Sequence, residues 1–175
     1  DRAAGHMLLR PHPPAQAVRR DPTTRAALVR VLCVDDNLAN LKLVETLLTD
    51  MGAQVLTATS GEEALDLLDQ EAVGLIFMDV QMPGMDGRQT TAELRAREQA
   101  AGASPVPIVA LTAHVLAGER RQLLNCGMND YMGKPINPEQ LRHCVRKYTG
   151  VTLNPLPEPP LSEEDQLETL PRRRI

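Results

Sequence analysis

Short apolar segments alternate with longer amphipathic segments through the middle of this 175-residue chain, and this alternation limits the fold more than any other feature. The apolar segments have the length and the aliphatic composition of strands buried on both faces. The segments between them carry apolar residues every three or four positions, the period of a helix with one buried face. The five predicted strands are Leu28–Val34, Gln54–Ala58, Gly74–Met78, Val106–Leu111 and, from its place in the alternation, Asp130–Met132.

The amphipathic segments begin and end at residues that favour helix termini. In the first segment the apolar face consists of Leu38, Leu41, Val44, Leu48 and Met51, and Gly52 follows as a terminator. The other predicted helices run from the N-cap Ser60 through Leu68, from Gly87 toward Ala101, from Thr112 to about Cys126, and from Asn137-Pro138 through Tyr148. Five strand-then-helix units predict an α/β fold with a parallel sheet covered on both faces.

The two ends of the chain differ in composition from this middle region. Residues 1–27 mix prolines with arginines and include the sequence GHM at Gly5–Met7, so we interpret them as a tag remnant and a disordered linker. Residues 151–175 are rich in proline and then acidic, which predicts a second disordered linker. A short helix from Ser162 to Leu170 is the one element expected there, since Ser162 and Asp165 resemble a capping box. One domain is therefore predicted, over residues 28–150.

Charge and cysteine content exclude several function classes. The net charge is −4 and no long basic run occurs, so we expect no nucleic-acid binding. Cys33, Cys126 and Cys144 lie far apart without metal-ligand spacing and are expected to be reduced thiols of a cytoplasmic protein, with Cys33 in a strand. No apolar stretch approaches the length of a membrane span and no signal peptide is evident, so no membrane contact is expected from these residues.

Residues that suit phosphoryl chemistry follow the predicted strands, at the sheet edge where parallel α/β proteins bind ligands. Asp35 and Asp36 follow the first strand, Asp79 the third, Thr112 the fourth, and Lys134 lies just past the fifth. Three carboxylates at one edge repel each other, and Mg²⁺ relieves that repulsion because it prefers oxygen ligands and shares phosphate oxygens. The lysine and the hydroxyl supply a positive partner and a hydrogen-bond donor for a phosphoryl group.

Asp79 is the candidate nucleophile of this edge, able to form an acyl phosphate. It ends the apolar run Leu75–Met78, so the strand is expected to hold its carboxylate exposed at the tip. Pro83-Gly84 follows closely and favours a type II turn that leaves the site open. The backbone carbonyl of Gln81 is near enough in sequence to join the metal ligands.

Four segments together resemble the receiver domain of two-component signalling, over roughly Arg30 to Gly150. They are VLCVDDN, FMDVQMPGMDG, VALTAH and GMNDYMGKPI. The resemblance implies a flavodoxin-like (βα)5 fold, doubly wound, with strand order 2-1-3-4-5. It also implies Asp35 and Asp36 as acidic metal-site residues, Asp79 as phosphoacceptor, and Thr112 and Lys134 as phosphate sensors. The segments are more similar to receivers within hybrid sensor kinases of the GacS/BarA type than to free-standing regulators.

This resemblance implies a place in a phosphorelay. A receiver takes a phosphoryl group from a phosphohistidine of a histidine kinase domain and, in a hybrid kinase, passes it to a histidine phosphotransfer domain. The donor histidine is then not in this chain. The resemblance further implies a cytoplasmic domain whose parent protein can be anchored in the inner membrane.

The resemblance also implies a conformational switch and several tuning positions. Phosphate at Asp79 is expected to draw Thr112 inward, while Tyr131 rotates into the space that Thr112 vacates.

The same resemblance implies a cis Lys134–Pro135 bond, which is expected to aim the lysine at the site. Ala113 leaves room for the phosphate, and Gln81 and His114 are hypothesised to tune its lifetime.

Other interpretations fit these residues less well. Any single one of these residues is more often a helix cap or a surface charge, whereas their convergence on one edge favours a functional site. A phosphate-binding loop is excluded because five residues separate Gly127 from Gly133 and Pro135 follows the lysine. An aspartyl phosphatase would have a second acid where this chain has Gln81. A degenerate receiver that only binds partners is disfavoured by intact Asp36, Asp79 and Lys134 and stays an alternative.

Overall fold

The structure is a computed structural model that describes residues 29–113 and 116–157. One five-stranded sheet runs through it with strand order β2-β1-β3-β4-β5, and every neighbouring pair is parallel. The strands are β1 (Arg30–Val34), β2 (Gln54–Ala58), β3 (Leu75–Asp79), β4 (Ile108–Thr112) and β5 (Asp130–Gly133). The predicted fold class and strand order are confirmed.

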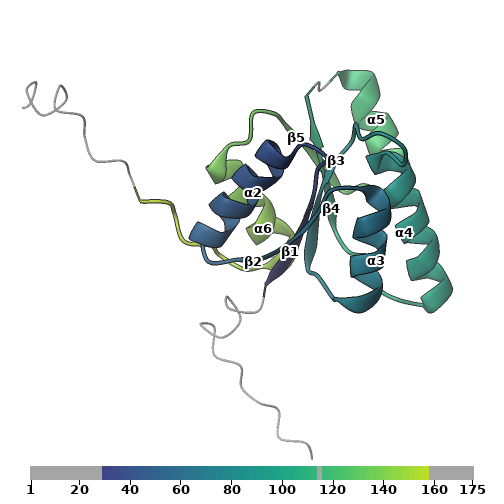
Figure 1. Ribbon diagram of the computed structural model, residues 1–175, viewed down its shortest axis with the longest axis horizontal. Helices are drawn as coiled ribbons and strands as arrows, with labels where there is room; N and C mark the ends of the chain where they lie inside the picture. Colours follow the sequence, from purple (N-terminus) through teal and green to yellow (C-terminus); the bar gives the residue numbers. More distant parts are fainter. Residues whose placement is uncertain (1–28, 114–115, 158–175) are drawn as a thin grey trace, which may run out of the picture.

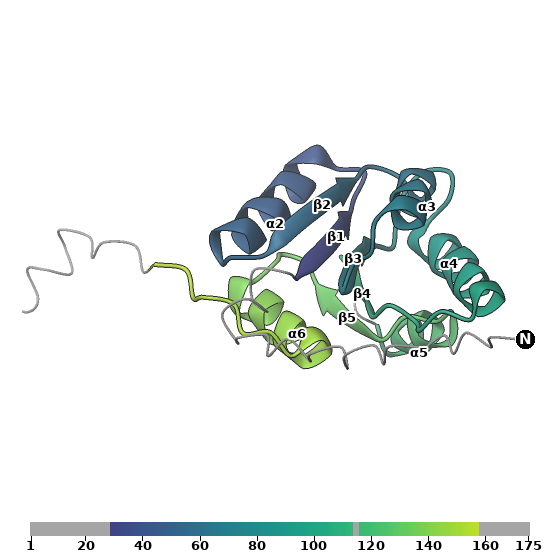
Figure 2. The same ribbon diagram turned by 90° about the horizontal axis from the view of Figure 1, so that it is seen from below.

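Five helices cover the two faces of the sheet. They are α2 (Leu38–Asp50), α3 (Gly61–Gln70), α4 (Gly87–Ala101), α5 (Ala117–Asn125) and α6 (Pro138–Thr149). Helices α2 and α6 cover one face, and α3, α4 and α5 cover the other (Figures 1 and 2). Among the described residues, none of the helices combines the length and the apolar character needed to cross a membrane.

Strand residues alternate between two buried clusters, one under each layer of helices. In β3, Phe77 packs with the cluster beneath α2 and α6, whereas Met78 packs with the cluster beneath α3 and α4. Cys33 is buried in β1, as predicted. Because both faces are covered, apolar residues occupy consecutive positions in the strands, and this accounts for the short continuous apolar runs in the sequence.

Local capping signals fix most of the helix starts. The side chain of Asn37 accepts hydrogen bonds from the first turn of α2, and Ser60 does so for α3. Asp86 and Gln89 form a capping box at the start of α4. Asn137 caps α6 with Pro138 in the first turn, as the sequence predicted.

Helix α5 differs from the prediction. The expected helix began after Thr112, but α5 begins at Ala117, and its N-cap residue Leu116 provides no side-chain hydrogen bond. An apolar N-cap cannot satisfy the first backbone N–H groups, so the helix start has no local signal in the sequence.

The predicted domain boundary at residue 150 is wrong for the segment that follows. Val151 and Leu153 are buried in the cluster beneath α2 and α6, with Leu153 only 3% exposed, and Leu156 packs against the same cluster. The backbone N–H of Asn154 donates to the Met51 carbonyl at 3.0 Å. The apolar side chains of residues 151–157 therefore pack against the core, which the proline-rich composition of this segment did not indicate. The linkers predicted for 1–27 and 158–175, with the short helix, lie outside the described residues.

Candidate phosphoryl-transfer site

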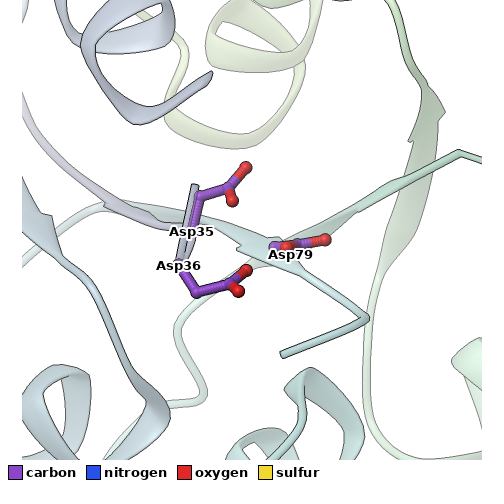
Figure 3. A group of neighbouring side chains, drawn as sticks. All are labelled: Asp35, Asp36 and Asp79. Atoms are coloured by element: carbon purple, nitrogen blue, oxygen red, sulfur yellow. The ribbon is translucent and has the colours of Figure 1, made fainter. Parts of the chain in front are cut away.

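Three carboxylates meet at the carboxyl end of the sheet. Oxygen atoms of Asp35, Asp36 and Asp79 all lie within 4.8 Å of one another. Figure 3 shows Asp35 and Asp36 from the loop after β1, with Asp79 from the end of β3. Strands β1 and β3 are hydrogen-bonded neighbours in the sheet, which is why residues far apart in sequence converge here.

Asp79 is the last residue of β3 and is only 5% exposed. The expectation of a carboxylate exposed at the strand tip is therefore corrected, since the loops around the tip cover most of it. The loop turns away at Gly84, whose φ of 74° is the value that the third position of a type II turn requires. The chain then returns close to the strand end at Gly87, where a Cβ atom would lie 2.3 Å from the Asp79 carbonyl oxygen. Only glycine fits that approach.

Lys134 brings the opposite charge to the two buried carboxylates. Its Nζ lies 3.3 Å from Oδ2 of Asp35 and 3.3 Å from Oδ1 of Asp79. The Lys134–Pro135 peptide bond is cis, and the backbone N–H of Lys134 donates to the Thr112 carbonyl at 2.8 Å. The lysine thus reaches across the sheet edge from the far side of β4.

Burial and like charge act together on Asp79. The pKa of Asp79 is raised to about 6, first by burial and then by the neighbouring Asp35 carboxylate, while Lys134 opposes both. Asp35 is 2% exposed and accepts a hydrogen bond from the Asn37 backbone N–H at 2.9 Å. One ammonium thus contacts the two buried carboxylates, and the exposed Asp36 adds a third negative charge within 4.8 Å of them, an arrangement that favours an added cation.

A cleft of about 230 Å³ opens above these groups. Thr112, Ala113 and the carboxylates line it together with Gln81 and Lys134, and so do Asn37 and Asn40 at the start of α2. The structure therefore brings together the predicted Asp35, Asp36, Asp79, Thr112, Lys134, Gln81 and Ala113, and His114 lies outside the described residues. The sequence reasoning missed the two asparagines, although Asn37 carried the signal of a helix cap next to two acids.

Tyr131 does not line this cleft. It is half-buried in β5 and packs against the cluster beneath α3 and α4, with the Arg120 guanidinium of α5 centred 5.3 Å from its ring centroid. In the sheet register, Ala110 pairs with Tyr131 and Thr112 with Gly133, so Thr112 and Tyr131 lie on adjacent strands.

Residues 31–146 match the family of response regulator receiver domains. The sensor protein GacS of Pseudomonas syringae pv. syringae is 55% identical over 146 residues, which cover 82% of this chain and 16% of that protein. The histidine-protein kinase BarA of Escherichia coli K12 is 43% identical over 121 residues, which cover 67% of this chain and 12% of that protein. The chain thus spans less than a fifth of the length of these relatives.

Two solved structures extend the comparison to the fold. The receiver domain of the sensor histidine kinase PA1611 of Pseudomonas aeruginosa, described with a magnesium ion coordinated in its active-site cleft, has a TM-score of 0.63 and 34% identity, covering 70% of this chain and 98% of that chain. The complex of the Saccharomyces cerevisiae phosphotransfer protein Ypd1 with the Ssk1 receiver domain gives a TM-score of 0.66 and 31% identity, covering 69% of this chain and 88% of the matched chain. With the acidic cluster, the lysine and the sheet order all in place, this chain belongs to the response regulator receiver domain family.

Proposed function

We propose that this receiver domain accepts a phosphoryl group on the carboxylate of Asp79. One observation carries the proposal: a nearly buried carboxylate at the end of the central strand lies within 4.8 Å of two others and 3.3 Å from the lysine ammonium. A nucleophile held rigidly by a buried strand, next to groups that balance phosphate charge, suits in-line phosphoryl transfer.

Asp79, Lys134 and Thr112 have separate roles in the transfer. An oxygen of Asp79 attacks phosphorus, the bond from phosphorus to the leaving group breaks, and the bonding electrons go with the leaving group. Lys134 balances the negative charge of the phosphoryl oxygens, and the Thr112 hydroxyl can donate a hydrogen bond to them.

The acidic residues fit a divalent cation. Asp35, Asp36 and Asp79 would hold Mg²⁺ together with the backbone carbonyl of Gln81, which lines the same cleft. When bound, the ion would neutralise charge between the carboxylates and the incoming phosphoryl group. The magnesium ion in the cleft of the related PA1611 receiver supports this choice of metal.

The partners are proposed from the relatives. GacS and BarA are named as sensor kinases, and the yeast complex joins a receiver to a histidine phosphotransfer protein. We propose a histidine kinase domain as the phosphohistidine donor and a histidine phosphotransfer domain as the acceptor, within a hybrid kinase. The receiver would then work on the cytoplasmic side of a parent that is anchored in the inner membrane.

The switch is likewise a proposal. Thr112 and Tyr131 lie on adjacent strands, and Tyr131 contacts Arg120 of α5. A movement of Thr112 toward the phosphate can therefore reach the α5 surface through a single neighbouring side chain.

The test is phosphorylation by acetyl phosphate with Mg²⁺, followed by intact mass spectrometry. We expect a gain of one phosphoryl group, lost in Asp79→Asn and in the presence of a chelator. Asp36→Asn is a second control, because it keeps the nucleophile and removes an exposed carboxylate of the metal site.

Each alternative gives a different result. A folded wild-type protein that never gains mass would indicate a receiver that only binds partners. Continued release of inorganic phosphate far beyond one equivalent per chain would indicate a phosphatase.

A further inference from the structure

A second and larger cleft borders the acidic one. It has a volume of about 480 Å³ and lies between the loop after β3, the start of α4 and the helix α5. Helices α4 and α5 cover the same face of the sheet (Figures 1 and 2). Gln81 and Thr112 line both clefts, so the second one, which we call the Arg88 cleft, adjoins the place where a phosphoryl group would meet Asp79. Its other lining residues are Val80, Met82, Pro83, Asp86, Arg88, Glu119 and Leu123.

Arg88 in this cleft lacks the partners that other arginines of α4 have. Its Nε is buried and makes no hydrogen bond, and it is the one such buried side-chain nitrogen or oxygen within residues 29–113 and 116–157. Arg95 and Arg97 of the same helix both pair with carboxylates. A buried donor without a partner is costly, and in native structures it commonly marks the place of a water or an ion.

Two carboxylates also line the cleft and limit what it can bind. The side chain of Asp86 accepts a hydrogen bond from the Gln89 backbone N–H at 2.8 Å, and Glu119 is half-buried in the first turn of α5. These acids oppose a ligand group that arrives with its own negative charge. A group that arrives neutral and becomes negative only during the reaction meets less opposition. Arg88 would then interact more strongly with the transition state than with the bound donor.

We propose that the Arg88 cleft receives the leaving group of a small acyl phosphate, with Arg88 facing the carboxylate that forms. This inference rests on the proposed phosphoacceptor function of Asp79. In the step, an Asp79 oxygen forms a bond to phosphorus and the bond from phosphorus to the acyl oxygen breaks. Its electron pair stays on that oxygen, giving a carboxylate that needs no proton at neutral pH.

The size of the cleft agrees with this class of donor. A water occupies about 30 Å³, so the cleft holds an acetyl group and several waters, or a longer acyl chain against Met82 and Leu123. The phosphoryl end would remain with Asp79, and Gln81 and Thr112 would lie between the two ends of the donor.

The experiment compares two donors that differ in their leaving group. Acetyl phosphate releases acetate, whereas phosphoramidate releases ammonia when its phosphorus–nitrogen bond breaks. For Arg88→Gln we expect the phosphorylation rate constant to fall roughly tenfold or more with acetyl phosphate and to stay within about twofold with phosphoramidate. Arg88→Lys is expected to lie between wild type and Arg88→Gln, because the ammonium keeps the charge without the planar fork.

Arg97→Gln is the matched control. It removes the same charge from the same helix, at a residue whose partners are Asp69 and Glu93 outside both clefts. We expect its rate constants to equal those of wild type with both donors.

The remaining outcomes would overturn the inference. An equal loss with both donors would mean that Arg88 acts through the fold or through Asp79, and no loss with either would mean that it does not contact the leaving group. If wild type accepts phosphate from phosphoramidate but Arg88→Gln is unimpaired with acetyl phosphate, the inference about Arg88 fails and the proposed function of Asp79 stands. If wild type accepts phosphate from neither donor, the proposed function fails with it.

Discussion

At the scale of single residues, the chemistry of the site follows from unequal burial of like charges. Asp35 and Asp79 are buried and share the ammonium of Lys134, whereas Asp36 is exposed. One lysine cannot balance all three carboxylates. The metal-free protein therefore holds electrostatic repulsion that a cation or a proton at Asp79 would relieve.

This repulsion predicts an unusual dependence of stability on pH. The pKa of Asp79 is raised to about 6 by burial and by Asp35, so the folded state holds the proton more tightly than the unfolded state. The contribution of Asp79 to stability is then largest below its unfolded pKa and is lost as pH rises through about 6. Asp79→Asn cannot ionise at this position. Its free energy of unfolding should therefore increase relative to that of wild type by roughly 1 to 3 kcal/mol as pH rises from 4 to 7.5.

Urea denaturation in the presence of a chelator measures this gain. Asp36→Asn is the matched control, since its carboxylate is exposed and should give no such pH-dependent gain. A constant difference between Asp79→Asn and wild type at all pH values would contradict the assignment.

Magnesium should separate wild type from Asp36→Asn, two proteins that are expected to be about equally stable without the metal. Wild type should gain about 1.4 kcal/mol of unfolding free energy for each tenfold excess of Mg²⁺ over its Kd, because only the folded state assembles the three carboxylates. Asp36→Asn should bind Mg²⁺ at least about tenfold more weakly while its metal-free stability stays within about 0.5 kcal/mol of wild type. The Mg²⁺-induced gain should also shrink at pH 5, where a proton on Asp79 competes. Thermal or urea unfolding across a Mg²⁺ titration tests all three, and an equal gain in both proteins would exclude the acidic cluster as the site.

At the scale of elements, residues 151–157 act as a strap across one helical layer. After α6 ends at Gly150, the strap buries Val151 and Leu153 beneath α2 and α6. Arg142 of α6 donates from its Nε to the Leu153 carbonyl at 3.3 Å. The strap thus contacts the C-terminal end of α2 at Met51 and the first half of α6 at Arg142, on the layer whose α2 begins beside the acidic cleft.

Leu153→Ala should therefore destabilise the protein by about 2 to 4 kcal/mol, as large-to-small changes in a core do. Thr152→Ala, one position earlier and exposed, should change the unfolding free energy by less than about 0.5 kcal/mol. Denaturant unfolding of both variants measures these changes in the unfolding free energy. Two equally small effects would mean that the strap does not belong to the folded unit.

At the scale of the whole molecule, the order of the strands places the acids and the threonine of the site in the middle of the sheet, away from its two edges. Strands β1, β3 and β4 carry the acids and the threonine at their ends, while β2 lies at one edge and β5 at the other. Tyr131 of β5 contacts Arg120 of α5, so the proposed switch connects the site with the β5 edge.

Phosphorylation should accordingly alter the structure near the β5 edge more than near the β2 edge. We expect amide chemical shifts in β5 and α5 to move together with those of the site, while those of α3 and β2 stay close to their unphosphorylated values. NMR spectra with and without the phosphodonor measure this, with Asp79→Asn as the unreactive control. Shifts spread evenly over both edges of the sheet would contradict a switch through Thr112 and Tyr131.

Much of this architecture could be predicted from the sequence, because its signals are local. Apolar runs marked the strands, Asn137-Pro138 and Ser60 marked helix starts, and acidic residues directly after the strands marked the site. The start of α5 was misplaced because Leu116 carries no capping group. The strap was missed because a proline-rich composition outweighed the alternation of Val151, Thr152 and Leu153.

The sequence by itself determined the α/β class, the order of elements and the residue types gathered at one edge, since periodicity and capping act over a few neighbouring positions. Only the tertiary structure decided that Asp79 is nearly buried, that Lys134 lies 3.3 Å from two carboxylates, and that Arg88, whose buried Nε makes no hydrogen bond, borders a second cleft. Burial, charge proximity and cleft shape depend on contacts between segments tens of residues apart, and no local pattern encodes those distances.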